Sequence, residues 1–453
     1  MKTYDIVTIG GGPAGITIAK NLGKVMKVAI IRPEEYSMIY CAMPYVIENE
    51  IPLEKSFKSD SLVTDSGADL IRSAVTRVDF ESKTVTTEDG EVYRYQHLII
   101  ATGADPILPP IPGADAKGVF VFKTGRHLRE IKETIDKHDI EHAVVVGAGA
   151  IGIEVAQALN KVTKGCHLVD MTPHVLPNLV EGDMIPPIEE KLIESGIQLH
   201  LNAKVEKLEG KEWVSHVILD TGEKIPLGES AENDGNGPRG VVVFSVGMRP
   251  RTELFANTGL KIGRQGILVN DKMETNIKDV YAVGDCVQFT SGITGEVVPG
   301  KLATNAVPMA RMLAKNFIGD NRQYQGFFNG AATKVEDLFV GGTGLKESEA
   351  RNHFDVIVSY TELTTIFPIL PNPKKIKMKL IADRKTRRVL GAQMVSGSPV
   401  IDKLNTVTLA IQNKLTLQHL AELSYAAQPY QSFYPANNII VACAEKILDQ
   451  LRN

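Results

Sequence analysis

The sequence lacks any pair of neighbouring cysteines. Its 453 residues include four cysteines, which lie far apart and show no CxxC spacing: Cys41, Cys166, Cys286 and Cys443. This distribution excludes a disulfide scaffold and offers no cysteine-based metal site, so we expect no metal. Isolated thiols fit a reducing compartment, and we expect a cytoplasmic protein.

Long hydrophobic runs and an excess of charge of one sign are also absent. No uninterrupted apolar run approaches the ~18 residues that a membrane span requires. The 50 Lys and Arg residues nearly balance the 54 Asp and Glu residues, giving a net charge of −4. This balance gives no electrostatic reason to expect nucleic acid or an anionic membrane as a partner. Residues 1–5 lead directly into a predicted strand, which leaves no room for a signal peptide.

A glycine motif follows the first predicted strand at once. Gly10, Gly12 and Gly15 have GxGxxG spacing between a strand at residues 5–10 and a helix at residues 16–22. In dinucleotide-binding units these glycines allow a tight turn, close approach to a pyrophosphate and close packing of helix on strand. The acid that normally ends the second strand and binds the ribose is missing, because Ile31 and Arg32 stand there.

A carboxylate slightly further along the chain could replace this missing acid. Glu34 or Glu35 follows the second strand within four residues, and we take Glu34 as the candidate.

A second glycine motif begins about 135 residues after the first. Gly147, Gly149 and Gly152 again lie between a predicted strand and a predicted helix, and the next strand ends in Asp170. An acid about 20 residues after the first glycine binds the ribose of NAD and repels the 2′-phosphate of NADP, so NADH should be preferred. Asp170 could instead cap a helix or stabilise a turn. Two motifs in one chain predict two dinucleotides, typically FAD and NAD(P)H.

Further candidates for cofactor binding lie near residue 285. A predicted strand ends in Gly284-Asp285, where the carboxylate could accept hydrogen bonds from polyol hydroxyls such as those of a flavin ribityl chain. Taken locally, Asp285 could equally be a turn residue. A helix is predicted to open at Ala303, with its N-terminal amides toward an electron-rich ring edge. Gly247, directly after a strand at residues 241–246, completes this group.

Cys41 lies where a short polar stretch, residues 37–45, leads into a predicted helix. A cysteine at the start of a helix has its thiolate favoured by unpaired N–H groups and by the helix dipole. A lone cysteine is otherwise a small, inert packing residue. The two nucleotide motifs around it favour the redox interpretation.

Taken together, these motifs resemble those of the FAD- and NAD(P)H-dependent disulfide oxidoreductases over essentially the whole chain. The similarity is greatest to the branch with one redox cysteine: coenzyme A-disulfide reductases, persulfide or polysulfide reductases, and NADH oxidases or peroxidases. The branch signature Ser-Phe-x-x-Cys-Gly-x-Pro-Tyr is matched by Ser37, Cys41, Pro44 and Tyr45. Met38 and Ala42 depart from it.

The resemblance implies a role for each matching position. Cys41 would attack a disulfide or persulfide sulfur, and reduced flavin, recharged by NADH, would then free it. Thr102 and Gly103 would join the first motif in holding FAD, and Glu154 would lie near the nicotinamide. Tyr430, in a Pro-Tyr turn, would reach the Cys41 site of a partner subunit, or would be a packed interface aromatic.

Other positions depart from subgroups of the family. Pro13-Ala14 replaces the histidine that peroxidases and water-forming oxidases tend to carry after the first glycines, which weighs against a peroxidase. Tyr40 replaces the Asn typical of coenzyme A reductases, and the first helix offers only Lys20 and Lys24 as anchors for coenzyme A phosphates. Phe367 stands near the position of a family tyrosine in the C-terminal sheet.

We therefore expect an α/β protein with two Rossmann-like dinucleotide-binding domains and a C-terminal α+β dimerisation domain. The expected boundaries are residues 1–113 with 247–324 for FAD, 114–246 for NAD(P)H and 325–453 for dimerisation. Residues 104–113, rich in proline, are expected to form a linker between the first two.

The expected enzyme is a homodimer that passes electrons from NADH through FAD and Cys41 to a disulfide, persulfide or polysulfide, with coenzyme A derivatives among the candidate substrates. An NADH oxidase that reduces O2 at the flavin is the alternative enzyme. A flavoprotein redox sensor or electron-transfer partner is the alternative from another class.

Overall fold

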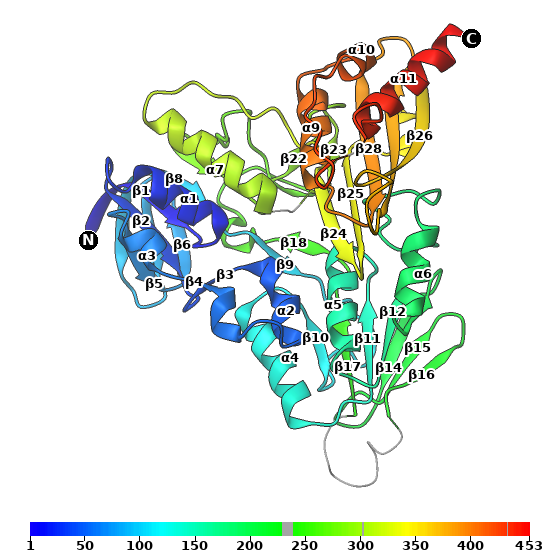
Figure 1. The fold of residues 1–453 in the computed structure, drawn as a ribbon. Helices are drawn as coiled ribbons and strands as arrows, with labels where there is room; N and C mark the ends of the chain where they lie inside the picture. The colour runs from blue at the N-terminus through cyan, green and yellow to red at the C-terminus, as the bar shows by residue number, and fades with distance from the viewer. Residues whose placement is uncertain (229–238, 301–302, 433) are drawn as a thin grey trace.

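The chain forms three units, each built around its own sheet (Figure 1). The computed structural model describes residues 1–228, 239–300, 303–432 and 434–453. Within these parts of the chain, no helix is both long and apolar enough to cross a membrane.

The first unit combines residues from two separate parts of the chain in one sheet. Its strand order is β5-β2-β1-β8-β7-β6. Strand β21 also pairs in parallel with β8, along the edge of β8 that faces away from β1. Strands β2, β1, β8 and β21 are parallel, so their carboxyl ends meet at one edge of the sheet. The elements are β1 (Lys2–Ile9), α1 (Pro13–Leu22), β2 (Val28–Arg32), β3 (Ser37–Met38), η1 (Tyr40–Ala42), α2 (Met43–Ile47), η2 (Leu53–Ser56), β4 (Phe57–Lys58), α3 (Ser61–Thr64), β5 (Asp69–Arg72), β6 (Val75–Asp79), β7 (Thr84–Thr87), β8 (Val92–Ile100), η3 (Glu253–Phe255), β19 (Ile262–Gly263), β20 (Gly266–Ile267), β21 (Val280–Ala282), β22 (Phe289–Thr290), β23 (Val297–Val298) and α7 (Ala303–Phe317).

The second unit has a five-stranded parallel sheet in the order β10-β17-β11-β12-β13. A three-stranded antiparallel sheet, β14-β15-β16, packs its apolar residues against one face of that sheet. The elements are β10 (Val119–Val121), α4 (Gly125–Lys137), β11 (His142–Val146), α5 (Ala150–Asn160), β12 (Gly165–Val169), α6 (Pro186–Glu194), β13 (Ile197–His200), β14 (Val205–Glu209), β15 (His216–Leu219), β16 (Lys224–Pro226) and β17 (Gly240–Phe244).

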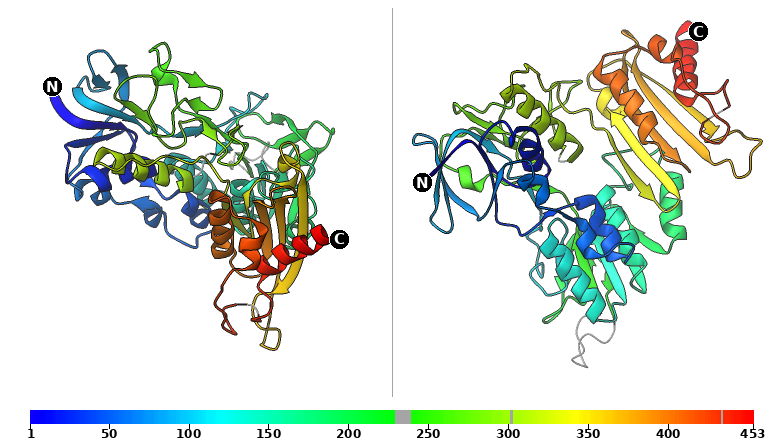
Figure 2. Two further views of the ribbon diagram at one scale, coloured as in Figure 1. Left: turned by 90° about the horizontal axis from the view of Figure 1, so that it is seen from above. Right: turned by 60° about the vertical axis from the view of Figure 1, so that its left-hand side comes forward.

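The third unit is an antiparallel sheet in the order β24-β25-β28-β27-β26, with helices packed on it. One end of this sheet meets α5 and α6 of the second unit, as the two views of Figure 2 also show. The elements are β24 (Ala331–Val335), β25 (Leu338–Gly344), α8 (Glu347–Ala350), β26 (Val356–Thr364), β27 (Lys375–Asp383), β28 (Val389–Ser396), α9 (Ile401–Gln412), α10 (Leu417–Ala421) and α11 (Ile439–Arg452).

This architecture confirms the predicted fold class: two parallel, Rossmann-like sheets followed by an antiparallel C-terminal sheet. The domain boundaries themselves stay a prediction. The prediction of an irregular linker at residues 104–113 is partly wrong, because β9 (Ala104–Pro106) pairs with β18 (Met248–Pro250). The two chain segments that connect the first two units therefore run side by side as a two-stranded antiparallel sheet. Its hydrogen bonds pair backbone N–H and C=O groups at the start of this proline-rich stretch.

Three histidines form a row across neighbouring strands of the second sheet. His167 in β12 lies between His142 in β11 and His200 in β13, with ring centroids 5.4 and 5.3 Å away. Its Nδ1 is 3.0 Å from Nε2 of His200. Burial lowers the pKa of His167 from 6.5 to about 4, and the two neighbouring rings add to this effect.

We expect this row to make folding stability depend on pH. The unfolded chain binds a proton at His167 near pH 6.5, whereas the folded chain does so only near pH 4, so the free energy of unfolding decreases as pH falls through this window. His167→Gln should reduce the fall in calorimetric melting temperature between pH 7 and pH 5. His138→Gln, at a partly exposed position outside the row, is the control, and an equal fall in all three proteins would contradict the assignment.

Candidate active site

The first glycine motif adopts the geometry that its spacing predicts. Gly10 has φ +119°, and a Cβ there would lie 2.1 Å from the carbonyl oxygen of Ala101. A Cβ on Gly15 would lie 2.1 Å from the carbonyl oxygen of Gly10, whereas one on Gly12 would meet nothing within 4 Å. The first and third glycines therefore allow the turn and the packing of α1 on β1, and the second leaves an open face for a pyrophosphate.

The second motif repeats this geometry in the second unit. Gly147 has φ +106°, a Cβ on Gly152 would lie 1.7 Å from the carbonyl oxygen of Gly147, and Gly149 is again open. Beside this turn lies Ser245, whose Oγ is buried and has no hydrogen-bond partner among the described residues. A site with an open glycine and a hydroxyl in need of a partner fits a dinucleotide.

Several predicted cofactor residues converge on the first glycine motif. Gly103 has φ +76° and faces open space, and the hydroxyl of Thr102 donates to the carbonyl of Arg251 at 2.7 Å. A Cβ on Gly284 would lie within 3.4 to 3.6 Å of side chains on α7 and α1, so its backbone sits between the first turns of both helices. Asp285 follows, its side chain 15% exposed. These residues fit FAD at the carboxyl edge of the first sheet.

The start of α7 agrees with the predicted helix at this edge. The helix begins at Ala303, and the preceding residues 301 and 302 lie outside the described part of the chain. Asn305, in the first turn, has a buried Nδ2 without a partner among the described residues. A flavin near this helix would provide an acceptor for that amide.

Strand β2 ends in a basic residue, Arg32, at the position where related units carry the acid that binds the ribose. Arg32 is 2% exposed, donates to the carbonyl of Glu35 at 3.0 Å and forms an ion pair with Asp60. Glu34 lies at the surface, with its Oε1 3.6 Å from Nη1 of Arg251. The structure thus places Glu34 close to the FAD residues but engaged with an arginine, and its ribose contact stays a prediction.

Asp170 lies directly against the second glycine motif. Its Oδ2 accepts from the backbone N–H of Ala148 at 2.6 Å, and its Oδ1 accepts from the N–H and the hydroxyl of Thr172 at 2.8 and 2.6 Å. The carboxylate therefore stabilises a turn, which was the alternative role considered for Asp170. This turn lies beside the glycine loop that would hold the pyrophosphate. Gly247, with φ +116°, lies after β17 at the entry to β18 and accepts from the N–H of Ile107 at 3.0 Å.

Cys41 is the one exposed cysteine of the four. It lies in η1, immediately before α2, which has only five residues and packs against α5. The phenol of Tyr45 lies near both Cys41 and Glu154, and its pKa is raised by burial and then by these negative charges. Burial also raises the pKa of Glu154, whose Oε1 accepts from the hydroxyl of Thr333 at 2.8 Å. All three units thus contribute to the surroundings of the thiol.

Two lysines near this centre were not found from the sequence. Lys58 pairs through β4 with β3, its ammonium is half-buried, and the Cys41 thiolate opposes the lowering of its pKa by burial. Lys123 has its Nζ 3.5 Å from Oδ2 of Asp285 and 4.7 Å from the ring centroid of Tyr40. Burial raises the pKa of Tyr40 to about 12. Neither lysine belongs to a motif, so only the fold could place them here.

The other three cysteines are buried. Burial raises the pKa of the thiol to about 12 at Cys166 and to about 11 at Cys286. The thiol of Cys443 donates to the carbonyl of Met378 at 3.7 Å. Cys41 is therefore the accessible candidate for sulfur chemistry.

Tyr430 lies on an exposed turn of the third unit, with 66% of its surface accessible. Its backbone N–H donates to Oε1 of Gln428 at 2.9 Å. The preceding carbonyl of Pro429 accepts from Phe367 at 3.2 Å, so the position of the missing family tyrosine lies beside this turn. The role of Tyr430 at the site of a partner subunit stays a prediction.

Comparison with known proteins gives two family matches. The pyridine nucleotide-disulphide oxidoreductase model matches residues 4–310, and the dimerisation domain of the same class matches residues 331–435. The chain belongs to the pyridine nucleotide-disulphide oxidoreductase family. It is accordingly a flavin-dependent oxidoreductase of a family that binds FAD and NAD(P)H, and it carries the family's dimerisation domain.

Individual relatives within this family carry different names. The chain is 33% identical over 465 residues to an NADH oxidase of Methanocaldococcus jannaschii, covering 99% of each chain. It is 31% identical to a CoA-dependent NAD(P)H sulfur oxidoreductase of Pyrococcus abyssi, covering 93% of this chain and 94% of the relative. The structure of an NAD-dependent persulfide reductase from A. fulgidus matches with a TM-score of 0.91 at 27% identity, over 98% of this chain and 83% of the other.

We expect Lys58 to influence the reactivity of Cys41. Because the charges of the two side chains interact, Lys58→Met should slow alkylation of Cys41 by iodoacetamide at neutral pH a few-fold. Lys55→Met, at an exposed position three residues earlier, is the matched control. Equal rates for Cys41 in both variants, measured by peptide mass spectrometry, would rule out this influence.

Proposed function

We propose that this oxidoreductase uses NADH to reduce a disulfide, persulfide or polysulfide at Cys41. The observation that carries the proposal is the position of Cys41, an exposed thiol directly before α2, which packs against the helix of the second glycine motif, and in charge interaction with Lys58. Names of relatives support the substrate class, since the Pyrococcus abyssi relative is a sulfur oxidoreductase and the A. fulgidus protein a persulfide reductase.

The chain's own residues account for the sulfur step. The Cys41 thiolate attacks one sulfur of the substrate, forms a new S–S bond and releases the second sulfur as a thiolate or hydrosulfide. Lys58 stabilises the anion before the attack. Bound FAD would supply the two-electron link between NADH and the resulting disulfide or persulfide of Cys41.

The proposal assigns each cofactor to one motif. FAD is held by the first glycine motif with Thr102, Gly103, Gly284, Asp285 and the start of α7. NADH is held by the second glycine motif, with Glu154 near the nicotinamide and Asp170 at the ribose. Because Asp170 carries a negative charge next to the loop, it disfavours a 2′-phosphate and favours NADH over NADPH.

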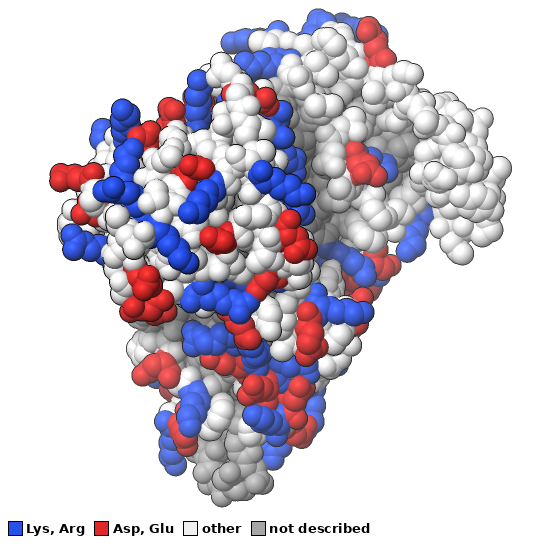
Figure 3. Space-filling model, turned by 90° about the vertical axis from the view of Figure 1, so that its left-hand side faces the viewer, with Lys and Arg blue, Asp and Glu red and all other residues white. Residues whose placement is uncertain are grey.

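The proposed enzyme is a homodimer that joins through the third unit. Segments 363–373 and 423–444 contain no Lys, Arg, Asp or Glu. Ile369, Tyr430 and Tyr434 in these segments are 90, 66 and 53% exposed. Figure 3 shows the lobe at the right, where these loops project, as a surface almost without charged side chains. An exposed apolar surface of this kind favours burial against a second copy.

An NADH oxidase is the second candidate, and one relative supports it directly. The Methanocaldococcus jannaschii protein, which aligns over 99% of this chain, is named an NADH oxidase. In that case O2 would be the acceptor, and Cys41 would not take part in turnover.

Anaerobic titration with NADH tests the role of Cys41. The wild-type holoenzyme should take up two equivalents and develop long-wavelength charge-transfer absorbance, because a thiolate next to flavin donates electron density. Cys41→Ser should take up one equivalent and lose sulfur reduction by at least about a hundred-fold. If Cys41→Ser takes up two equivalents or still reduces polysulfide, Cys41 is not the redox group. Oxygen uptake at an equal rate in both proteins would favour the oxidase.

Substitution of Asp170 tests the nucleotide preference. Asp170→Asn removes the charge that repels a 2′-phosphate, so the ratio of kcat/KM for NADH over NADPH should fall about ten-fold, equivalent to ~1.4 kcal/mol. Asp136→Asn on the exposed face of α4 is the control. An unchanged ratio would show that Asp170 does not determine the preference for NADH over NADPH.

A further inference from the structure

A fifteen-residue loop connects Asp170 with helix α6 in the second unit, and it holds the second glycine motif from both sides. The Asp170 carboxylate accepts from the N–H of Ala148 at 2.6 Å. The N–H of Leu176, further along the loop, donates to the carbonyl of the same Ala148 at 2.8 Å. Asp170 and the loop that follows it therefore bind both backbone groups of Ala148, the residue between Gly147 and Gly149.

The loop carries a conformation that local sequence disfavours. Leu176 has φ +53°, in the left-handed region that residues with a bulky side chain rarely occupy. Such a conformation persists only where surrounding contacts hold it. Within the second unit, Leu176 donates to Ala148, and its carbonyl accepts from the N–H of Leu179 at 2.9 Å. The third unit adds a contact at the next residue, because Nζ of Lys346 donates to the carbonyl of Pro177 at 2.7 Å.

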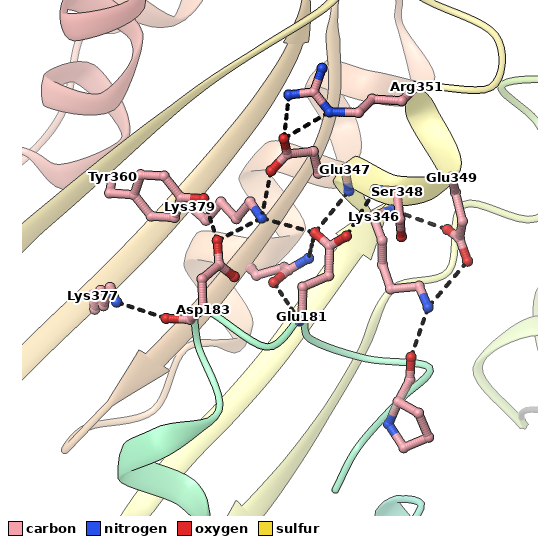
Figure 4. A network of polar contacts seen from close by, with 12 residues as sticks. Glu181, Asp183, Lys346, Glu347, Ser348, Glu349, Arg351, Tyr360, Lys377 and Lys379 are labelled. Atoms are coloured by element: carbon pink, nitrogen blue, oxygen red, sulfur yellow. Dashed lines mark hydrogen bonds and ion pairs between the residues drawn. The ribbon is translucent and has the colours of Figure 1, made fainter. Parts of the chain in front are cut away.

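Glu181 extends this attachment (Figure 4). Its carboxylate accepts from the backbone N–H groups of Glu347 and Ser348 at 2.9 and 2.8 Å, at the start of α8. Gln393 in β28 bonds both to its backbone N–H and to its carboxylate, each at 2.9 Å. The middle of the loop is thus bound to two elements of the C-terminal sheet unit.

Lys379 in β27 lies at the centre of these contacts and is 2% exposed. Its Nζ lies 3.0 Å from Glu181, 2.8 Å from Asp183 and 2.8 Å from Glu347. The hydroxyl of Tyr360 donates to Asp183 as well. Although burial alone would lower it, the hydrogen bonds that the ammonium donates to Asp183, Glu347 and Glu181 hold the pKa of Lys379 above its ordinary value, so the ammonium stays charged.

We propose that Lys379, Asp183 and Tyr360 are positioning residues for NADH, because they attach the loop of residues 171–185 to the C-terminal sheet and thereby fix Asp170 and Ala148 at the nucleotide site. The inference rests on the proposed function only in taking the second glycine motif as the NADH site. It does not depend on the electron acceptor. Through this attachment the dimerisation sheet determines nucleotide affinity without touching the nucleotide.

Two mild variants test the proposal in the holoenzyme. Tyr360→Phe removes one hydrogen bond to Asp183, and Asp183→Asn weakens its pairing with Lys379. Each should raise the Kd for NAD⁺, measured by calorimetry on the oxidised enzyme, about three- to ten-fold and should raise KM for NADH similarly. The value of kcat at saturating NADH, the FAD content and the dimeric state should stay unchanged.

Lys379→Met is the severe variant, since it leaves three close carboxylates, two of them partly buried, without their shared cation. If it folds, NAD⁺ affinity should fall further than in the mild variants. Two matched controls alter contacts elsewhere: Tyr4→Phe removes a tyrosine–aspartate hydrogen bond in the first unit, and Asp449→Asn weakens an exposed ion pair in the third.

The outcomes separate this proposal from the proposed function. Mild variants that bind NAD⁺ as tightly as the wild type, with only a lower melting temperature, would show that the attachment serves stability alone and would overturn the inference. Failure of the wild-type enzyme to bind NAD⁺ would overturn the assignment of the second glycine motif, and this inference with it. A fall in kcat with unchanged KM would also contradict the proposal, because the attachment would then act on the reaction and not on nucleotide binding.

Discussion

Both nucleotide sites depend on the same close approach between a helix and the turn before it. A Cβ on Gly15 or Gly152 would lie only 2.1 or 1.7 Å from the carbonyl oxygen of the motif's first glycine. Any side chain there would push the helix away from its strand and move the first-turn N–H groups from the place where a pyrophosphate can accept from them.

Parallel strands then bring the remaining residues of each site to one sheet edge. In the first unit, β21 pairs with β8 although about 180 residues separate them, and this pairing places Gly284 and Asp285 next to Gly103 and α1. The environment of Cys41 is composite in the same way. Glu154 comes from the second unit and is hydrogen-bonded to Thr333 of the third, so the surroundings of the thiol require all three units to be folded.

The third unit contributes two features: an exposed surface with few charges, and contacts that hold the loop next to the second glycine motif. Its segments 363–373 and 423–444 contain no Lys, Arg, Asp or Glu, and Ile369, Tyr430 and Tyr434 within them are exposed. Its sheet also holds the loop after Asp170 through charges centred on the buried Lys379. A buried ammonium surrounded by three carboxylates is stable only as a complete set, since removing one partner leaves charge without compensation. This requirement makes the junction between the second and third units specific in position, whatever its net contribution to stability.

The sequence by itself determined the local parts of this protein. GxGxxG spacing, the isolated Cys41 and the alternation of strands and helices predicted the fold class and the two glycine turns, because these features depend on neighbours within about ten residues. The ladder between β9 and β18, the charge interaction of Lys58 with Cys41, the bond of Leu176 to Ala148, and the ion pairs of the same loop with Lys379 were decided only by tertiary structure. Each joins residues distant along the chain, and pairing at such separations leaves no periodicity or spacing in the sequence.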